Sequence, residues 1–109
     1  MTQNVLIIDD DTYFTGILSQ ILKKSNHTVF VANTIEEGIT LLKDRLPELV
    51  YLDNQLPDGY GWGKAEYIMA NFPNIQLNLI SALDVPKTTT SLFRIVEKQQ
   101  LLEELTNNE

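Results

Sequence analysis

The stretch "VLIIDDD", residues 5–11, decides the fold, because four aliphatic residues run directly into three aspartates. A short and continuous apolar run is typical of a parallel strand that is covered on both faces. Like charges at its end repel one another, so their presence needs an explanation beyond packing. The stretch therefore predicts a buried strand whose carboxyl end carries unusual acidic chemistry.

Helical segments follow this strand and recur along the chain. The first begins at a cap supplied by Asp11 or Thr12, and the second begins at the capping box formed by Thr34 and Glu37. Apolar residues at helical spacing predict a third helix over residues 62–72. A last, short helix is expected to start after Lys98. The stretch between residues 82 and 91 contains Pro86 and a run of threonine, which disfavour a helix.

Apolar and β-branched runs between these segments predict the remaining strands. The five predicted strands cover residues 5–8, 28–32, 49–52, 75–80 and 92–96. Strands that alternate with helices or loops in this way are typical of an α/β fold, in which a parallel sheet is covered by helices on both faces. With 109 residues, no internal repeat and no linker, the chain is expected to form one domain over residues 1–109.

Polar side chains stand at the carboxyl ends of four of the five predicted strands. They are Asp9 and Asp10, Asp53, Ser81, and Lys98. In a flavodoxin-like doubly wound sheet with the order 2-1-3-4-5, the first and third strands are neighbours at the point where functional groups gather. Taken singly, each residue has an ordinary structural explanation, such as a solvated surface lysine for Lys98. Their convergence on one rim of one sheet is what indicates a site.

Three carboxylates on one rim need a compensating positive charge. Two carboxylates ~4 Å apart repel by about 4 kcal/mol at an effective dielectric constant near 20. A proton, a lysine or a divalent cation can offset this repulsion. Magnesium prefers carboxylate oxygens and keeps several waters, which leaves room for a phosphate oxygen.

The overall composition excludes several classes of function. The chain has 15 acidic and 8 basic residues, a formal net charge of −7, which disfavours nucleic acids and anionic membranes as partners. It contains no cysteine, so disulfides and thiolate zinc sites are excluded. No stretch has transmembrane length, and "MTQN" is not typical of a signal peptide. We therefore expect a cytoplasmic protein.

In this order and at these spacings, the motifs resemble the receiver domain of two-component response regulators over essentially the whole chain. "VLIIDDD" resembles the first strand of that family with its acidic pair, and "LVYLDNQLPDGYG" resembles the phosphoacceptor strand and loop, including Pro57 and Gly61. "LISA" is similar to the fourth strand, with Ser81 at the Thr/Ser switch position. Lys98 stands in the place of the family's lysine.

The resemblance implies a function and a set of site residues. Asp53 would accept a phosphoryl group from a sensor histidine kinase or a histidine phosphotransfer protein. Asp9, Asp10, Asp53 and the main-chain carbonyl of Gln55 would hold Mg²⁺, and Lys98 and Ser81 would contact the phosphoryl group. Such a chain is a phosphoacceptor that catalyses its own phosphotransfer and dephosphorylates slowly, rather than a turnover enzyme. As a stand-alone receiver it is expected to switch conformation and modulate an unknown downstream protein, without binding nucleic acid directly.

The sequence departs from the family pattern at three places. Gln99 follows the lysine where the family has proline, so we expect a trans bond there and an altered placement of Lys98. Ile95 replaces the aromatic switch residue, although Phe93 alternates onto the same face. The span from Ser81 to Lys98 is short, so the fourth helix is expected to be reduced or missing. These departures fall on the usual dimer surface, and we expect a monomer or a non-standard dimer.

Two other functions remain open from the sequence. The departures at residues 95 and 99 favour a pseudo-receiver, a protein-binding module that works without phosphorylation. A magnesium-dependent phosphatase with an aspartyl-phosphate intermediate would need a general acid two residues after the nucleophile. Gln55 stands at that position. Turnover is therefore disfavoured.

Overall fold

The computed structural model describes residues 2–83 and 93–107. The helices are α1 (Thr12–Lys24), α2 (Ile35–Arg45), the 3-10 helix η1 (Gly61–Lys64), α3 (Ala65–Asn71) and α4 (Lys98–Asn107). The strands are β1 (Asn4–Ile8), β2 (Thr28–Ala32), β3 (Leu49–Asp53), β4 (Gln55–Leu56), β5 (Gly59–Tyr60), β6 (Gln76–Ser81) and β7 (Phe93–Glu97).

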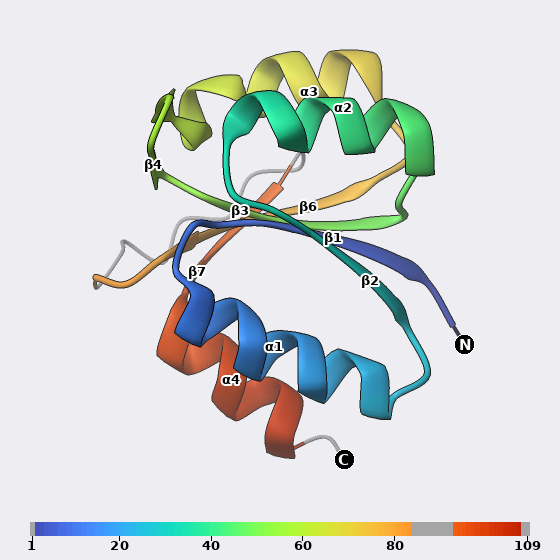
Figure 1. Cartoon of the computed structure of the whole chain (residues 1–109), viewed down its shortest axis with the longest axis vertical. Coiled ribbons are helices and arrows are strands. Elements are labelled where there is room, and N and C mark those ends of the chain that lie inside the picture. The colour runs from blue at the N-terminus through green and yellow to red at the C-terminus, as the bar shows by residue number, and fades with distance from the viewer. Residues whose placement is uncertain (1, 84–92, 108–109) are drawn as a thin grey trace.

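Five strands form one parallel sheet in the order β2-β1-β3-β6-β7. This order corresponds to the predicted 2-1-3-4-5, so the flavodoxin-like fold is confirmed. In register, Ile8 pairs with Leu52, and Ser81 at the end of β6 pairs with Glu97. The carboxyl ends of β1, β3, β6 and β7 therefore lie along one edge of the sheet, on the left in Figure 1.

Helices cover both faces of the sheet. Helices α2 and α3 lie on one face, and α1 and α4 lie on the other (Figure 1). Leu6 and Ile8 of β1 belong to one buried cluster, and Val5 and Ile7 belong to the other, with none of the four more than 1% exposed. The apolar run that opened the sequence is thus buried on both faces, as predicted.

The predicted helix starts of α1 and α2 are confirmed by their caps. The Asp11 side chain accepts a hydrogen bond from the Phe14 amide, so this third aspartate of the triplet begins α1. The Thr34 hydroxyl accepts from the Glu37 amide at 3.1 Å and begins α2. Both caps satisfy amides that a helix start otherwise leaves without partners.

Two predicted helix starts and one predicted loop differ from the structure. The helix expected over residues 62–72 begins as the 3-10 turn η1 and becomes α-helical only at Ala65. Its first turn contains Gly61 and Gly63, and glycine is a weak helix former. The loop before it contains a two-stranded hairpin, β4–β5. Helix α4 starts at Lys98 itself, because Gln99 lacks the ring with which proline disfavours a helical conformation in the residue before it.

The prediction of a reduced fourth helix falls on residues 84–92, which lie outside the described residues. The strands on either side, β6 and β7, pair in parallel from Leu77 with Phe93 to Ser81 with Glu97. Within residues 2–83 and 93–107, no helix has the length and hydrophobicity needed to cross a membrane.

Candidate functional site

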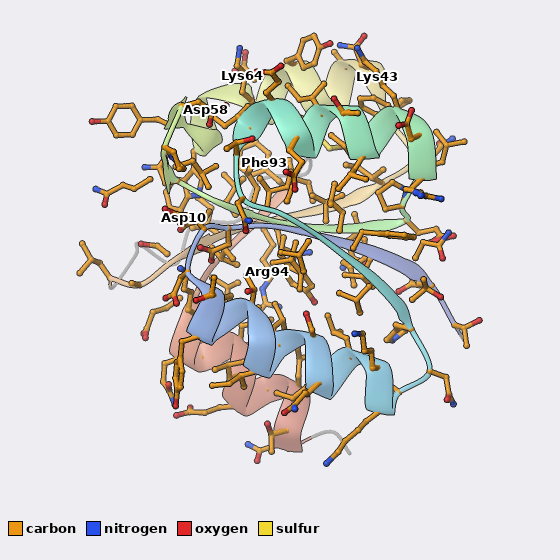
Figure 2. All side chains as sticks on the ribbon, in the orientation of Figure 1. Asp10, Lys43, Asp58, Lys64, Phe93 and Arg94 are labelled. Atoms are coloured by element: carbon orange, nitrogen blue, oxygen red, sulfur yellow. The ribbon has the colours of Figure 1, made fainter. Side chains whose placement is uncertain are left out.

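The three predicted carboxylates meet at the carboxyl edge of the sheet. Asp9 and Asp10 follow β1, and Asp53 ends β3, its neighbour in the sheet. Each offers a carboxylate oxygen, and these oxygens all lie within 4.8 Å of one another. Asp9 is fully buried and Asp53 is 8% exposed, whereas Asp10 lies on the surface beside the start of α1 (Figure 2).

Lys98 brings a positive charge into this carboxylate cluster. Its Nζ lies 2.8 Å from Asp9 Oδ2 and 3.6 Å from Asp53 Oδ1. The same ammonium group lies 4.8 Å from the centre of the Phe14 ring on α1, close enough for a cation–π contact. Burial alone would lower the pKa of Lys98, but the carboxylates of Asp9 and Asp53 outweigh it and raise that pKa. Lys98 is therefore charged and held in the cluster.

The surroundings of Asp53 raise the pKa of its carboxyl group. Burial, followed by the negative charge of Asp9, raises its pKa from 3.8 to about 6, and Lys98 opposes that shift. A raised pKa means that the ionised form of Asp53 is costly in the folded protein. A second cation close to Asp53 would reduce that cost.

Ser81 and Gln55 reach the same site. A cavity of about 620 Å³ is lined by Asp10, Asp53, Asn54, Gln55, Leu56, Pro57, Trp62, Ser81, Ala82, Leu83 and Lys98. The Ser81 hydroxyl oxygen accepts a hydrogen bond from the Leu83 amide at 3.2 Å. Five of the six residues predicted for the site line this cavity, and the sixth, Asp9, contacts the lining residue Lys98.

The loop after Asp53 is held by contacts that the sequence did not reveal. The main-chain carbonyl of Asn54 accepts from the Gly61 amide at 2.7 Å, and its side-chain oxygen accepts from the Trp62 amide at 3.2 Å. The indole Nε1 of Trp62 donates to the Leu52 carbonyl at 3.2 Å. Trp62 therefore ties η1 to β3 and forms part of the cavity wall.

Gly61 permits the closest approach in this loop. A Cβ atom at this position would lie 2.1 Å from the carbonyl oxygen of Asp53, a distance that no side chain can tolerate. The backbone of η1 therefore sits directly against the residue that carries the candidate nucleophile. The sequence pattern already marked Gly61 as a loop-shaping glycine, and the structure supplies the steric reason.

The structure also locates the residues that depart from the family pattern. Phe93 lies on the α2–α3 side of the sheet, and Arg94 lies on the opposite side (Figure 2). Ile95 is partly buried against the same cluster as Phe93, as alternation predicts. The described residues contain no cis peptide bond, so the predicted trans bond between Lys98 and Gln99 is confirmed.

The donor set of this pocket fits a hard divalent cation. Magnesium prefers carboxylate and carbonyl oxygens and binds through one or two carboxylates plus water or phosphate oxygens. Asp9, Asp10 and Asp53 supply three carboxylates whose oxygens lie within 4.8 Å of one another, and burial together with the charge of Asp9 makes ionised Asp53 costly.

Comparison with protein families identifies one match. Residues 5–107 match the family model described as the response regulator receiver domain. Among curated proteins, the KDP operon transcriptional regulatory protein KdpE of Escherichia coli is 31% identical over 90 residues, which cover 74% of this chain and 40% of that protein. The acid tolerance regulatory protein ActR of Rhizobium meliloti is 35% identical over 66 residues, which cover 61% of this chain and 34% of that protein. The chain thus spans well under half the length of these relatives.

Solved structures share the fold. A CheY-like response regulator receiver domain protein from Methanospirillum hungatei has a TM-score of 0.77 at 22% identity, over 99% of this chain and 94% of that one. NtrX from Brucella abortus, in complex with ATP, has a TM-score of 0.82 at 22% identity, over 99% of this chain and 26% of that one.

Proposed function

Because the chain belongs to the response regulator receiver family, we propose that it is a phosphoacceptor signalling domain with Asp53 as the phosphoacceptor. One observation carries this proposal. A largely buried carboxylate, that of Asp53, lies within 4.8 Å of two others and 3.6 Å from a lysine ammonium group, at the mouth of a cavity. We treat residues 1–109 as one receiver domain.

The proposed reaction transfers a phosphoryl group from a phosphohistidine. A carboxylate oxygen of Asp53 forms a bond to phosphorus while the bond between phosphorus and the imidazole nitrogen breaks. The electron pair of that bond stays on the imidazole, which then takes up a proton. The donor is a sensor histidine kinase or a histidine phosphotransfer protein.

The residues around Asp53 have distinct roles in this step. Lys98, already 3.6 Å from Asp53 Oδ1, offsets negative charge on the phosphoryl oxygens. The Ser81 hydroxyl donates a hydrogen bond to the phosphoryl group, and its contact with the Leu83 amide links that event to the backbone at Leu83. When bound by Asp9, Asp10, Asp53 and the main-chain carbonyl of Gln55, Mg²⁺ would neutralise charge on the same oxygens.

The output passes through another protein. Phosphorylation of Asp53 replaces the single negative charge of its carboxylate with about two negative charges on the phosphoryl oxygens, beside Lys98, which is also the first residue of α4. The populations of two surface conformations shift in response, and a downstream protein binds one of them. We propose that the protein acts in the cytoplasm, as a monomer or a non-standard dimer, without direct contact to nucleic acid.

One observation favours a second candidate, a pseudo-receiver that binds its partner without phosphorylation. Ile95, which replaces the aromatic switch, already packs against the buried cluster on the α2–α3 side. A phosphatase is disfavoured, because Gln55 has no proton to give at the position where a general acid is needed.

Tryptophan fluorescence tests the proposal, because Trp62 lies in the wall of the cavity. We expect Mg²⁺ to change the emission of the wild type, and beryllofluoride to change it further only when Mg²⁺ is present. Asp53→Ala should abolish the beryllofluoride response. If wild type shows neither change, the phosphoacceptor function is wrong and the pseudo-receiver is favoured. Repeated hydrolysis of a phosphate ester would favour the phosphatase.

A further inference from the structure

The hairpin that follows Asp53 is fastened to a helix that lies elsewhere in the sequence. Oδ1 of Asp58 accepts a hydrogen bond from the Ile35 amide at 2.8 Å, and Oδ2 accepts from the Glu36 amide at 3.0 Å. Figure 2 shows Asp58 beside the start of α2. Both carboxylate oxygens accept a hydrogen bond, so Asp58 binds the N-terminus of α2 at two points.

These bonds complete the start of α2. The first amides of a helix have no partner inside it. The Asp58 carboxylate accepts hydrogen bonds from the first two amides, those of Ile35 and Glu36. The Thr34 hydroxyl accepts from the Glu37 amide, and the Thr34 carbonyl accepts from the Gly38 amide. The negative charge of Asp58 also faces the positive end of the helix dipole. Thr34 by itself is an ordinary helix cap. Capping of α2 therefore does not by itself explain why Asp58 adds two further hydrogen bonds.

The position of Asp58 within the hairpin supplies that reason. Asp58 lies between the two short strands, in which Gln55 pairs with Tyr60 and Leu56 pairs with Gly59. Gly59 has a φ of 142°, a conformation that side chains rarely adopt, which allows the tight return of the chain. A constraint on Asp58 is therefore transmitted across the ladder to Gln55, the residue whose carbonyl is assigned to the metal.

We propose that Asp58 is a positioning residue for the metal and phosphoryl site, acting by holding the β4–β5 hairpin against the N-terminus of α2. The inference rests on the proposed function. The Asp58 carboxylate touches neither the carboxylate cluster nor Lys98 among the described contacts. It acts through the backbone of the hairpin, whose inner side is anchored by the buried Leu56. Loss of these two hydrogen bonds would free the hairpin and displace the main chain of Gln55, which lines the cavity.

The chain offers two matched controls. Thr34→Ala removes a cap from the same helix end but leaves the hairpin fastened, because Thr34 immediately precedes α2 and caps only its own helix. Glu36→Gln removes one negative charge close to Asp58 while keeping the Glu36 amide that Asp58 binds. The first control separates positioning from helix capping, and the second separates positioning from simple charge.

Calorimetric titration of the full chain with MgCl₂ tests the inference, with urea unfolding run on the same samples. Asp58→Ala should weaken magnesium binding roughly tenfold, as loss of a supporting group around a metal site typically does. Asp58→Asn, which keeps one oxygen acceptor, should give an intermediate loss and serves if Asp58→Ala does not fold. Thr34→Ala should lower the urea midpoint about as much as Asp58→Ala does, without changing the magnesium affinity. Glu36→Gln should leave the magnesium affinity within about twofold of that of the wild type.

The outcomes separate this inference from the function on which it rests. If Asp58→Ala and Thr34→Ala bind magnesium equally well, Asp58 is a helix cap and the inference is wrong while the proposed function stands. If Glu36→Gln weakens binding as much as Asp58→Ala, the effect is one of charge and the inference is again wrong. If wild type itself binds no magnesium, the metal site fails and the inference fails with it.

Discussion

The ammonium group of Lys98 lies 2.8 Å from Oδ2 of Asp9, and this ion pair joins the first residue of α4 to the end of β1. Asp9 is fully buried and Lys98 is 9% exposed, so the pair is largely removed from water. No loop intervenes between the lysine and its helix. A change of charge in the pocket therefore acts on the end of α4 directly.

Lys98→Met should lower the free energy of unfolding by about 3 kcal/mol, because it leaves the buried carboxylate of Asp9 without its partner. Methionine keeps an apolar stem against the Phe14 ring, so the loss reports charge rather than packing. Urea denaturation at neutral pH measures this loss in the free energy of unfolding. The double variant Asp9→Asn, Lys98→Met should recover part of the loss, and a Lys98→Met protein as stable as wild type would contradict the ion pair.

Asp53→Asn should stabilise the protein near neutral pH in magnesium-free buffer. The folded pKa of Asp53, about 6, lies above its ordinary value of 3.8, so the folded state binds the proton more tightly than the unfolded state does. Stability is therefore lost as the pH rises from 3.8 to about 6, the two pKa values of Asp53 in the unfolded and folded states, and replacing the ionisable group removes that loss. We expect a gain of about 1–3 kcal/mol near pH 7 that vanishes below about pH 4. A gain that is the same at both pH values would contradict the shift.

Gly61→Ala should distort the site, because its Cβ would collide with the carbonyl oxygen of Asp53. We expect a loss of about 2–4 kcal/mol in the free energy of unfolding and a weaker response to magnesium. Gly63→Ala is the matched control, since a Cβ there meets nothing within 4 Å. Equal behaviour of the two alanine variants in urea denaturation would show that the close approach at Gly61 is not required.

Asn78→Leu should stabilise the fold by about 1 kcal/mol, because a buried donor without a partner is costly. Asn78 is 3% exposed, and its Nδ2 has no hydrogen-bond partner among the residues that the structure describes. Thermal unfolding of Asn78→Leu beside Asn78→Asp, which should be destabilised by its buried charge, measures the effect. A loss of stability in Asn78→Leu would mean that this amide has a role the contacts do not reveal.

Much of this fold could be predicted from the pattern of the sequence. The apolar run before Asp9 predicted a strand covered on both faces, and Thr34 with Glu37 predicted the start of α2. The convergence of Asp9 and Asp53 followed from the strand order, because neighbouring parallel strands bring their carboxyl ends together. These predictions rest on local periodicity and on a general rule of topology.

The remaining features depend on contacts between distant residues, which a local pattern does not carry. Asp58 and Ile35 are 23 residues apart, and nothing around "PDG" indicates that its carboxylate caps another helix. The start of α4 was predicted one residue too late, because Glu97 and Lys98 follow the apolar run of β7 and Lys98 was interpreted as a strand-end residue. The 3-10 turn at Gly61 reflects the approach to Asp53, which appears only once β3 and η1 are packed together.

The most direct test of the central claim is the intact mass of the protein after incubation with Mg²⁺ and a small-molecule phosphodonor. Wild type should gain the mass of one phosphoryl group, and the gain should disappear when Mg²⁺ is chelated and in Asp53→Ala. Wild type that gains no mass under these conditions, or an Asp53→Ala protein that gains it equally, would contradict the assignment of Asp53 as the phosphoacceptor.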